Sequence, residues 1–78
     1  MPAKKYNGHK SWGYWNVALW IGNDEGLYNM ARGYIRREKN RDEAARSIVA
    51  YLRNTGITQT PDGANYSVSA VRAAITGL

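Results

Sequence analysis

The sequence predicts an all-α fold: a compact single domain of about four short helices with a Trp-rich helix at its centre. Residues that favour helix starts stand before four candidate helices, at Ser11, Asn23, Asn40 and Ser67. Two of these helices are followed by glycine, which is typical of helix ends. The 78 residues are enough for one small hydrophobic core but too few for two domains.

The composition is that of a globular domain, with 44% hydrophobic and 22% charged residues. Eleven basic against six acidic residues give a net charge of +5, which favours a nucleic acid, an acidic protein face or a membrane surface as partner; alternatively, the charge only keeps the protein soluble. No apolar run approaches the roughly 20 residues that span a bilayer, and no apolar segment follows the basic N-terminus. We therefore expect a cytoplasmic protein without a membrane partner.

Residues 1–10 contain three lysines and no periodicity, which indicates an irregular basic arm, and residues 11–78 form the helical domain. The first helix is expected from Trp12 to Ile21, with Ser11 as cap and Gly22-Asn23 as stop. Its apolar side chains surround it almost completely, which is typical of a central helix. At least two of its three tryptophans are expected in the core, and Trp12 with Tyr14 at an uncovered edge.

The second helix is expected to start at an Asn23 cap, with Asp24 and Glu25 in its first turn. Gly33 within it suggests a close approach of another backbone, because glycine in a helix is otherwise unfavourable. One side of this helix is expected to be mostly apolar and to comprise Leu27, Met30, Ala31, Tyr34 and Glu38, with Ile35 at its edge.

The third helix has the clearest start, because Asn40 and Glu43 have the spacing of a capping box. Gly56 is the expected stop. Its apolar face is expected to comprise Ala44, Ala45, Ile48, Val49 and Leu52.

Residues 60–63, TPDG, predict a tight turn with Pro61 at its first central position and Gly63 at positive φ. Ser67 then caps a fourth helix. Its shared apolar face comprises Val68, Val71, Ile75 and Leu78. The alternation of Ala64, Tyr66, Val68 and Ala70 leaves a short strand as an alternative.

Chemistry-bearing residues are scarce. His9 is the only histidine and cysteine is absent, so neither a metal site of the usual type nor a cofactor is expected. Four of the six acidic residues stand at predicted helix starts, where capping explains them. No nucleophile motif or phosphate-binding loop is present, and we expect no enzymatic activity.

Two groups of residues favour binding instead. The densest basic group, a strip along the second helix and the next junction, comprises Arg32, Arg36, Arg37, Lys39 and Arg41. Such a strip suits a phosphate backbone or an acidic protein face, or it is merely solvated. The aromatic residues are all Trp or Tyr, which are enriched at interfaces, and Trp12 and Tyr14 are the expected contact residues.

The segment WNVALWIGNDEGLY at 15–28, with Tyr6-Asn7-Gly8 and TPDG at 60–63, resembles a group of small uncharacterised proteins encoded by phages and other mobile elements. Their usual NYETW opening is replaced by Ser11-Trp12-Gly13-Tyr14 before Trp15. The resemblance implies an accessory protein of a phage or mobile element and supplies no activity, cofactor or catalytic residue. Such proteins often bind and disable a host complex.

The combined expectation is a non-catalytic phage-type accessory protein that binds a host protein or nucleoprotein complex. By analogy of size and origin, inhibition of antiviral defence (anti-CRISPR or anti-restriction) is the expected role. Direct DNA or RNA binding through the basic strip is one alternative, and a small self-associating virion or assembly protein is another. Either a monomer or a homodimer fits the sequence.

Overall fold

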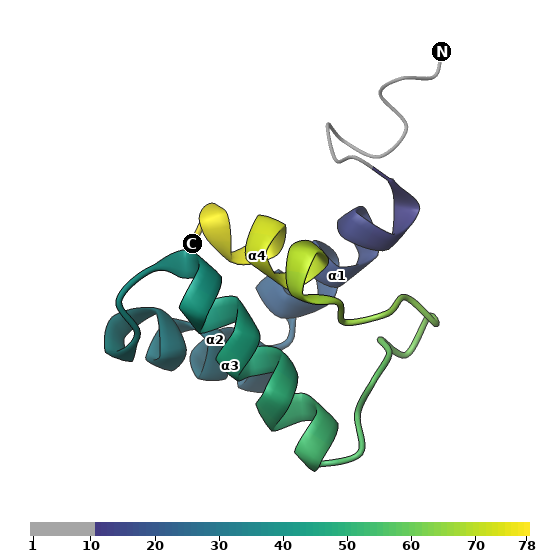
Figure 1. Cartoon of the computed structure of the whole chain (residues 1–78). Helices are drawn as coiled ribbons and strands as arrows, with labels where there is room; N and C mark the ends of the chain where they lie inside the picture. Colours follow the sequence, from purple (N-terminus) through teal and green to yellow (C-terminus); the bar gives the residue numbers. More distant parts are fainter. Residues whose placement is uncertain (1–10) are drawn as a thin grey trace.

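The computed structural model describes residues 11–78 as four helices (Figure 1). They are α1 (Trp12–Asn23), α2 (Glu25–Arg37), α3 (Arg41–Asn54) and α4 (Val68–Thr76). Among these residues the only β-type pairing is one isolated antiparallel bridge between Gln59 and Asn65. The predicted all-α single domain is therefore confirmed, while the predicted arm at residues 1–10 lies outside the described part of the chain.

The first two helices share a single linking residue. Ser11 caps α1 as predicted, but the helix continues through Gly22 and Asn23, which the sequence suggested as its stop. Asp24 ends α1 and also caps α2, because its carboxylate accepts the Leu27 amide at 2.9 Å. The predicted Asn23 cap was thus wrong by one residue: both side chains can cap a helix, and only Asp24 is free of α1.

Helix α2 covers the core with few fully buried residues. Ala31 is buried, and its neighbours on the same face, Leu27, Met30 and Tyr34, are half-buried. No heavy atom outside the local helix backbone lies within 4 Å of the position that a Cβ of Gly33 would occupy. The expected close backbone approach at Gly33 was therefore wrong.

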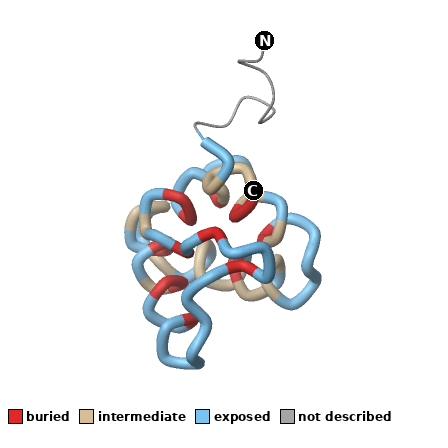
Figure 2. The backbone as a smooth tube through the Cα atoms, turned by 90° about the vertical axis from the view of Figure 1, so that its right-hand side faces the viewer, coloured by how far each residue is buried: buried red, intermediate tan, exposed pale blue. Residues whose placement is uncertain are grey.

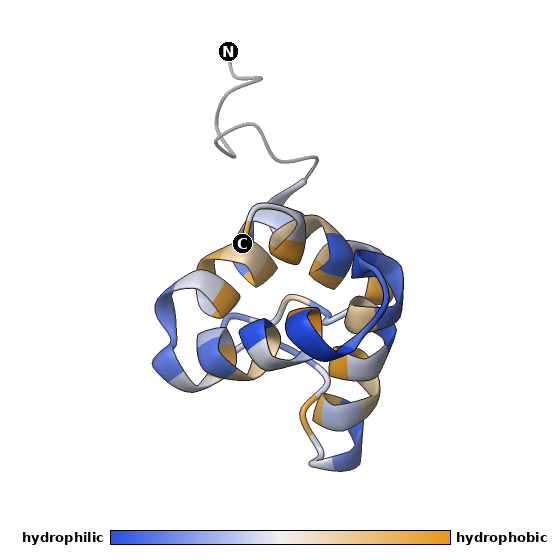
Figure 3. Ribbon diagram, turned by 90° about the vertical axis from the view of Figure 1, so that its left-hand side faces the viewer, coloured by the Kyte–Doolittle hydropathy of each residue, from blue (hydrophilic) through white to orange (hydrophobic). Residues whose placement is uncertain are grey.

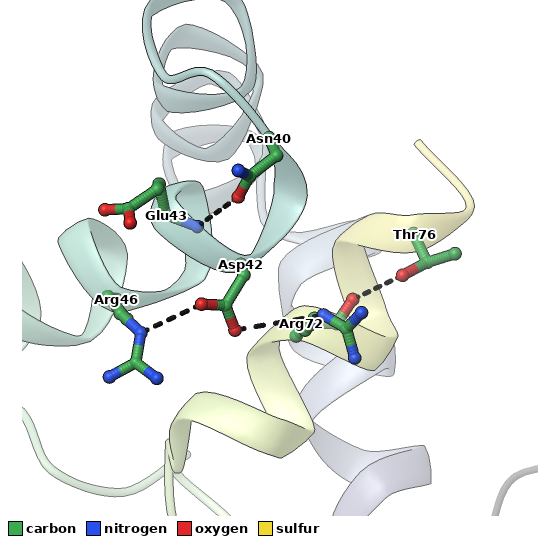
Figure 4. Close-up of polar contacts among 6 residues, drawn as sticks. All are labelled: Asn40, Asp42, Glu43, Arg46, Arg72 and Thr76. Carbon is green, nitrogen blue, oxygen red and sulfur yellow. Dashed lines mark hydrogen bonds and ion pairs between the residues drawn. The ribbon is translucent and has the colours of Figure 1, made fainter.

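Helix α3 matches its sequence pattern. The Asn40 side chain accepts the Glu43 amide at 2.8 Å, although Figure 4 shows the Glu43 carboxylate turned away from Asn40. The predicted apolar face is buried in full. After the helix, Gly56 has φ of 86° and the Ile57 amide donates to the Leu52 carbonyl at 2.8 Å, which is the bonding of a Schellman stop.

The connector and α4 also follow the helical prediction. Gly63 has φ of 97° in the turn at 60–63, and its amide donates to the Thr60 carbonyl at 2.9 Å. Ser67 caps α4 by accepting the Ala70 amide. The alternative strand through residues 64–70 was wrong, because α4 begins at Val68.

The four helices form a ring in which α1 and α3 each pack mainly against α2 and α4. Buried positions face the inside of this ring (Figure 2), and polar positions gather where α2 leads into α3 (Figure 3). The buried apolar side chains are Val17, Ile21, Ala31, Ala44, Ala45, Ile48, Val49, Leu52, Ala64, Tyr66, Ala70, Val71 and Ile75.

The Trp-rich helix is one side of this ring, so the expectation of a central helix covered on most sides was wrong. Val17 and Ile21 of α1 enter the core. Trp15 and Trp20 are only half-buried and Trp12 is 40% exposed, so the tryptophans border the core instead of filling it. A chain of this size has too few other helices to enclose an apolar one.

Candidate functional site

Four exposed cations of the described residues lie on α2 and the turn that follows it, namely Arg32, Arg36, Arg37 and Lys39, and we name this group the cationic face. All four side chains are exposed, because the apolar side of α2 is turned to the core. Among residues 11–78, ion pairs involve only Asp42 with Arg46 and Arg72. The four cations of this face therefore have no carboxylate partner in the described chain.

Tyrosines hold two of these arginines. The Arg32 guanidinium donates to the Tyr28 hydroxyl at 2.9 Å and lies 5.7 Å from the centre of that ring. The Arg37 guanidinium lies 4.5 Å from the centre of the Tyr34 ring. These contacts restrict where the guanidinium groups point without neutralising their charge, so the face is partly ordered before any partner binds.

Arg41, which the sequence placed in the same strip, has a different environment. It is half-buried, and its guanidinium donates to the carbonyls of Ile75 and Leu78, both at 3.2 Å. These carbonyls lie at the C-terminal end of α4, where a cation is favourable. Arg41 therefore links the start of α3 to the C-terminal end of α4 and does not belong to the group of four exposed cations.

Trp12 and Tyr14 do not lie together either. Two residues apart on a helix, they point in directions about 160° apart. Trp12 is exposed, whereas Tyr14 is half-buried and packs against the core. The uncovered edge of α1 is instead the α1 stripe, which we define as Trp12, Trp15 and Leu19; Leu19 is 36% exposed.

A polar cluster joins the start of α3 to α4 (Figure 4). The Asp42 carboxylate lies 3.0 Å from the Arg46 guanidinium and 4.0 Å from that of Arg72. The hydrogen bond and the charge of Asp42 raise the pKa of Arg46. Since all three side chains are substantially exposed, these ion pairs add little stability.

An apolar groove of about 630 Å³ runs between α2, the end of α3 and the connector. Tyr51 and Ile57, 47% and 43% exposed, are among its lining residues. Asp24 is its only charged lining residue, and Tyr66 lies on its wall. Burial, and secondarily the charge of Asp24, raise the pKa of Tyr66. Sequence reasoning missed the groove because its walls come from distant segments.

A second feature that sequence reasoning missed is the clasp, a hydrogen-bonded group formed by Asn16, Trp20, Thr60 and Asp62. Asn16 is only 1% exposed, and its side-chain amide donates to the Asp62 carboxylate at 2.9 Å. The Thr60 hydroxyl donates to the side-chain oxygen of Asn16 at 2.5 Å. The Trp20 indole donates to the same carboxylate oxygen at 2.9 Å. The clasp fixes the 60–63 turn against α1.

The clasp has an electrostatic consequence and a sequence signal. Hydrogen bonds from Asn16 and then from Trp20 lower the pKa of Asp62. One signal was available: an asparagine stands alone within an apolar helix, and a buried amide requires partners. Two segments far apart in the sequence, WNVALWIGNDEG at 15–26 and TPDG at 60–63, supply all four members.

Neither a metal centre nor a membrane span emerges from the described residues. Within residues 11–78, no three His, Cys, Asp or Glu side chains group as metal ligands would. No helix there has the length and hydrophobicity needed to cross a bilayer. Glu25, Asp42 and Glu43 lie in first turns of helices as predicted, whereas Asp24, also expected in a first turn, is the cap of α2.

These observations define a small four-helix protein whose surface offers a cationic face, an apolar stripe and a groove. The chain belongs to DUF7249, a family of unknown function whose model matches residues 2–76. No curated protein and no solved structure matches the chain significantly.

Proposed function

We propose that the protein is a non-catalytic docking protein that binds a host protein or nucleoprotein complex through the cationic face. The observation that carries this proposal is a set of four exposed cations that have no carboxylate partner within residues 11–78, two of them in contact with tyrosines. Arginine guanidinium groups bind carboxylates and phosphates through paired hydrogen bonds. The expected contact on the partner is therefore an acidic protein surface or an exposed nucleic-acid backbone.

The resemblance to phage-encoded proteins supports a partner from an infected cell. Complexes of antiviral defence, of the CRISPR and restriction types, are the first partners to test, with inhibition as the proposed effect.

The test is co-purification of the tagged full-length chain from host lysate, followed by identification of its partner and reconstitution with that purified partner. Arg32→Glu with Arg36→Glu reverses two charges on the cationic face. Arg53→Glu with Arg72→Glu makes the same change in net charge on exposed residues of α3 and α4. We expect the first variant to lose the partner at least tenfold and the second to retain it, because only the first removes contact charges.

A nucleic-acid arm distinguishes the two kinds of acidic partner. Fluorescence anisotropy with a labelled duplex and a labelled single strand is measured for both variants over a series of salt concentrations. Binding that falls steeply with salt and is lost only in the Arg32 and Arg36 variant would assign the face to nucleic acid directly. If neither a protein partner nor nucleic acid distinguishes the two variants, the proposal is wrong.

A further inference from the structure

The α1 stripe has the spacing of a helix-pairing surface. Trp12, Trp15 and Leu19 are three and four residues apart, and Gly22 follows after three more. Alternating steps of three and four place these residues in one line along the helix, as in the a and d positions of a coiled coil. We propose that this line is a homodimer interface, in which α1 packs antiparallel against α1 of a second copy. This surface is separate from the cationic face and goes beyond the proposed docking function.

The line is accessible on the folded protein. Trp12 and Leu19 are 40% and 36% exposed, Gly22 is exposed and Trp15 is half-buried. The buried apolar residues of α1, Val17 and Ile21, face the opposite way, towards the core. Exposed apolar side chains grouped on one helix face mark an interaction surface more often than scattered ones do.

Charge favours a second copy as the occupant. Helix α1 contains no charged residue, whereas α2, α3 and α4 each contain at least one. Two copies that each carry a net charge of +5 repel each other, and contact through the uncharged helix keeps the cationic faces out of the interface. An acidic partner, by contrast, would find no complementary charge along α1.

Side-chain size favours the antiparallel arrangement. With the two helices centred on Val17, Trp12 lies opposite Gly22 of the second copy and Trp15 lies opposite its Leu19. Nothing lies within 4 Å of the position that a Cβ of Gly22 would occupy, so space for the opposing indole is present. A parallel pair would instead oppose Trp12 to itself and glycine to glycine, and would align the two helix dipoles unfavourably.

The interface is small, which sets its expected strength. The 12 residues of α1 span about 18 Å. Two helices of this length bury less than the roughly 1,200 Å² of stable complexes. A reversible dimer with a dissociation constant on the order of tens of micromolar is therefore expected.

The test is sedimentation velocity of the full chain from about 5 to about 500 µM, which brackets a constant of that order. The wild type should change from monomer to dimer over this range. Gly22→Glu fills the space needed by Trp12, and Trp12→Lys removes the indole, so each should weaken the dimer at least tenfold. Ala50→Glu is the control for Gly22→Glu: it adds the same negative charge at an exposed position of α3 and should leave the dimer intact. Circular dichroism melting verifies that every variant is folded.

Mixing the two weakened variants tests the register. A heterodimer of Gly22→Glu with Trp12→Lys keeps one native tryptophan–glycine contact and places the introduced glutamate opposite the introduced lysine. The mixture should therefore dimerise severalfold more tightly than either variant alone. A wild type that stays monomeric, an unaffected Gly22→Glu dimer, or a mixture without recovery would overturn the proposal. Growth beyond a dimer would also overturn it, because a symmetric α1–α1 contact closes after two copies.

Discussion

Helices α1 and α3 occupy equivalent places in the fold, since each packs mainly against α2 and α4, yet they are held there differently. Helix α3 buries five apolar side chains on one face and exposes polar ones on the other. Helix α1 buries Asn16, Val17 and Ile21 and leaves its tryptophans outside the core. An amphipathic helix has one face to bury, whereas an apolar helix has several, and here the clasp selects among them.

This comparison has a physical basis in the polar groups. The Asn16 amide is buried in an orientation in which it meets Thr60 and Asp62. In any rotation of α1 that buried Asn16 elsewhere, the amide would lose these partners, at a cost of about 1 to 3 kcal/mol. The buried Asn16 thus fixes which side of α1 faces the rest of the fold, as the apolar side does for α3.

The largest expected effect concerns the buried apolar face of α3. Ile48→Ala in α3 removes a side chain that is 0% exposed and should lower the free energy of unfolding by about 3 kcal/mol, through lost burial and a cavity. Urea denaturation followed by circular dichroism measures it. Arg53→Ala, on the exposed side of α3, should change the stability by less than about 0.5 kcal/mol. Similar losses in both variants would show that the α3 core does not carry the fold.

The second effect concerns the clasp. Asn16→Ala removes two hydrogen bonds and leaves the buried Thr60 hydroxyl without its acceptor, so we expect a loss of about 2 kcal/mol in urea denaturation. Asn29→Ala makes the same change at an exposed position of α2 and should be neutral or slightly stabilising. If the two variants are equally stable, the clasp does not orient α1.

A smaller effect distinguishes two glycines, one at the end of α3 and one within α2. Helix α3 ends at Gly56 with φ of 86°, so Gly56→Ala should cost about 1 kcal/mol because a Cβ disfavours that conformation. Gly33→Ala, within α2 and without steric obstruction, should instead stabilise the fold by about 0.8 kcal/mol. Thermal melting of both variants gives the signs directly. A stabilising Gly56→Ala would contradict the assigned stop.

The smallest effect is the pH dependence of the clasp, because the Asp62 side chain is exposed. The pKa of Asp62 is lowered in the folded state, so the ionised carboxylate is more favourable in the folded state than in the unfolded state. This contribution is present above the ordinary carboxyl pKa of about 4 and is lost as the pH falls towards the lowered value. Stability measured between about pH 6 and pH 3 should therefore fall more steeply in the wild type than in Asp62→Asn. Parallel curves would contradict the assignment.

Much of the fold could be read from local patterns. The caps at Ser11, Asn40 and Ser67, the stop at Gly56 and the whole buried face of α3 were predicted correctly, because each depends on residues within one or two turns. The shift of the α2 cap from Asn23 to Asp24 is also local, but two adjacent capping residues compete there.

The candidate site was predicted in part. Arg32 and Arg36 share an exposed side of α2 because they are four residues apart, whereas Arg37 lies about 140° around the helix from Arg32 and is exposed near the helix end with Lys39. Arg41 follows them in sequence but bonds to the end of α4, 34 residues away for Ile75. Likewise, the groove joins residues of α1, α2, α3 and the connector, and no local period contains that information.

The sequence alone determined four helices, most of their ends and the basic character of α2, since caps, glycines and periodicity act over a few residues. Tertiary structure decided which face of α1 is covered, where Arg41 bonds and which apolar side chains remain exposed. Those outcomes depend on contacts such as Asn16 to Asp62, 46 residues apart, which form only when the connector returns to α1. For a helix that is apolar on nearly every side, hydrophobic burial by itself does not distinguish between these orientations, whereas the need to satisfy a buried amide does.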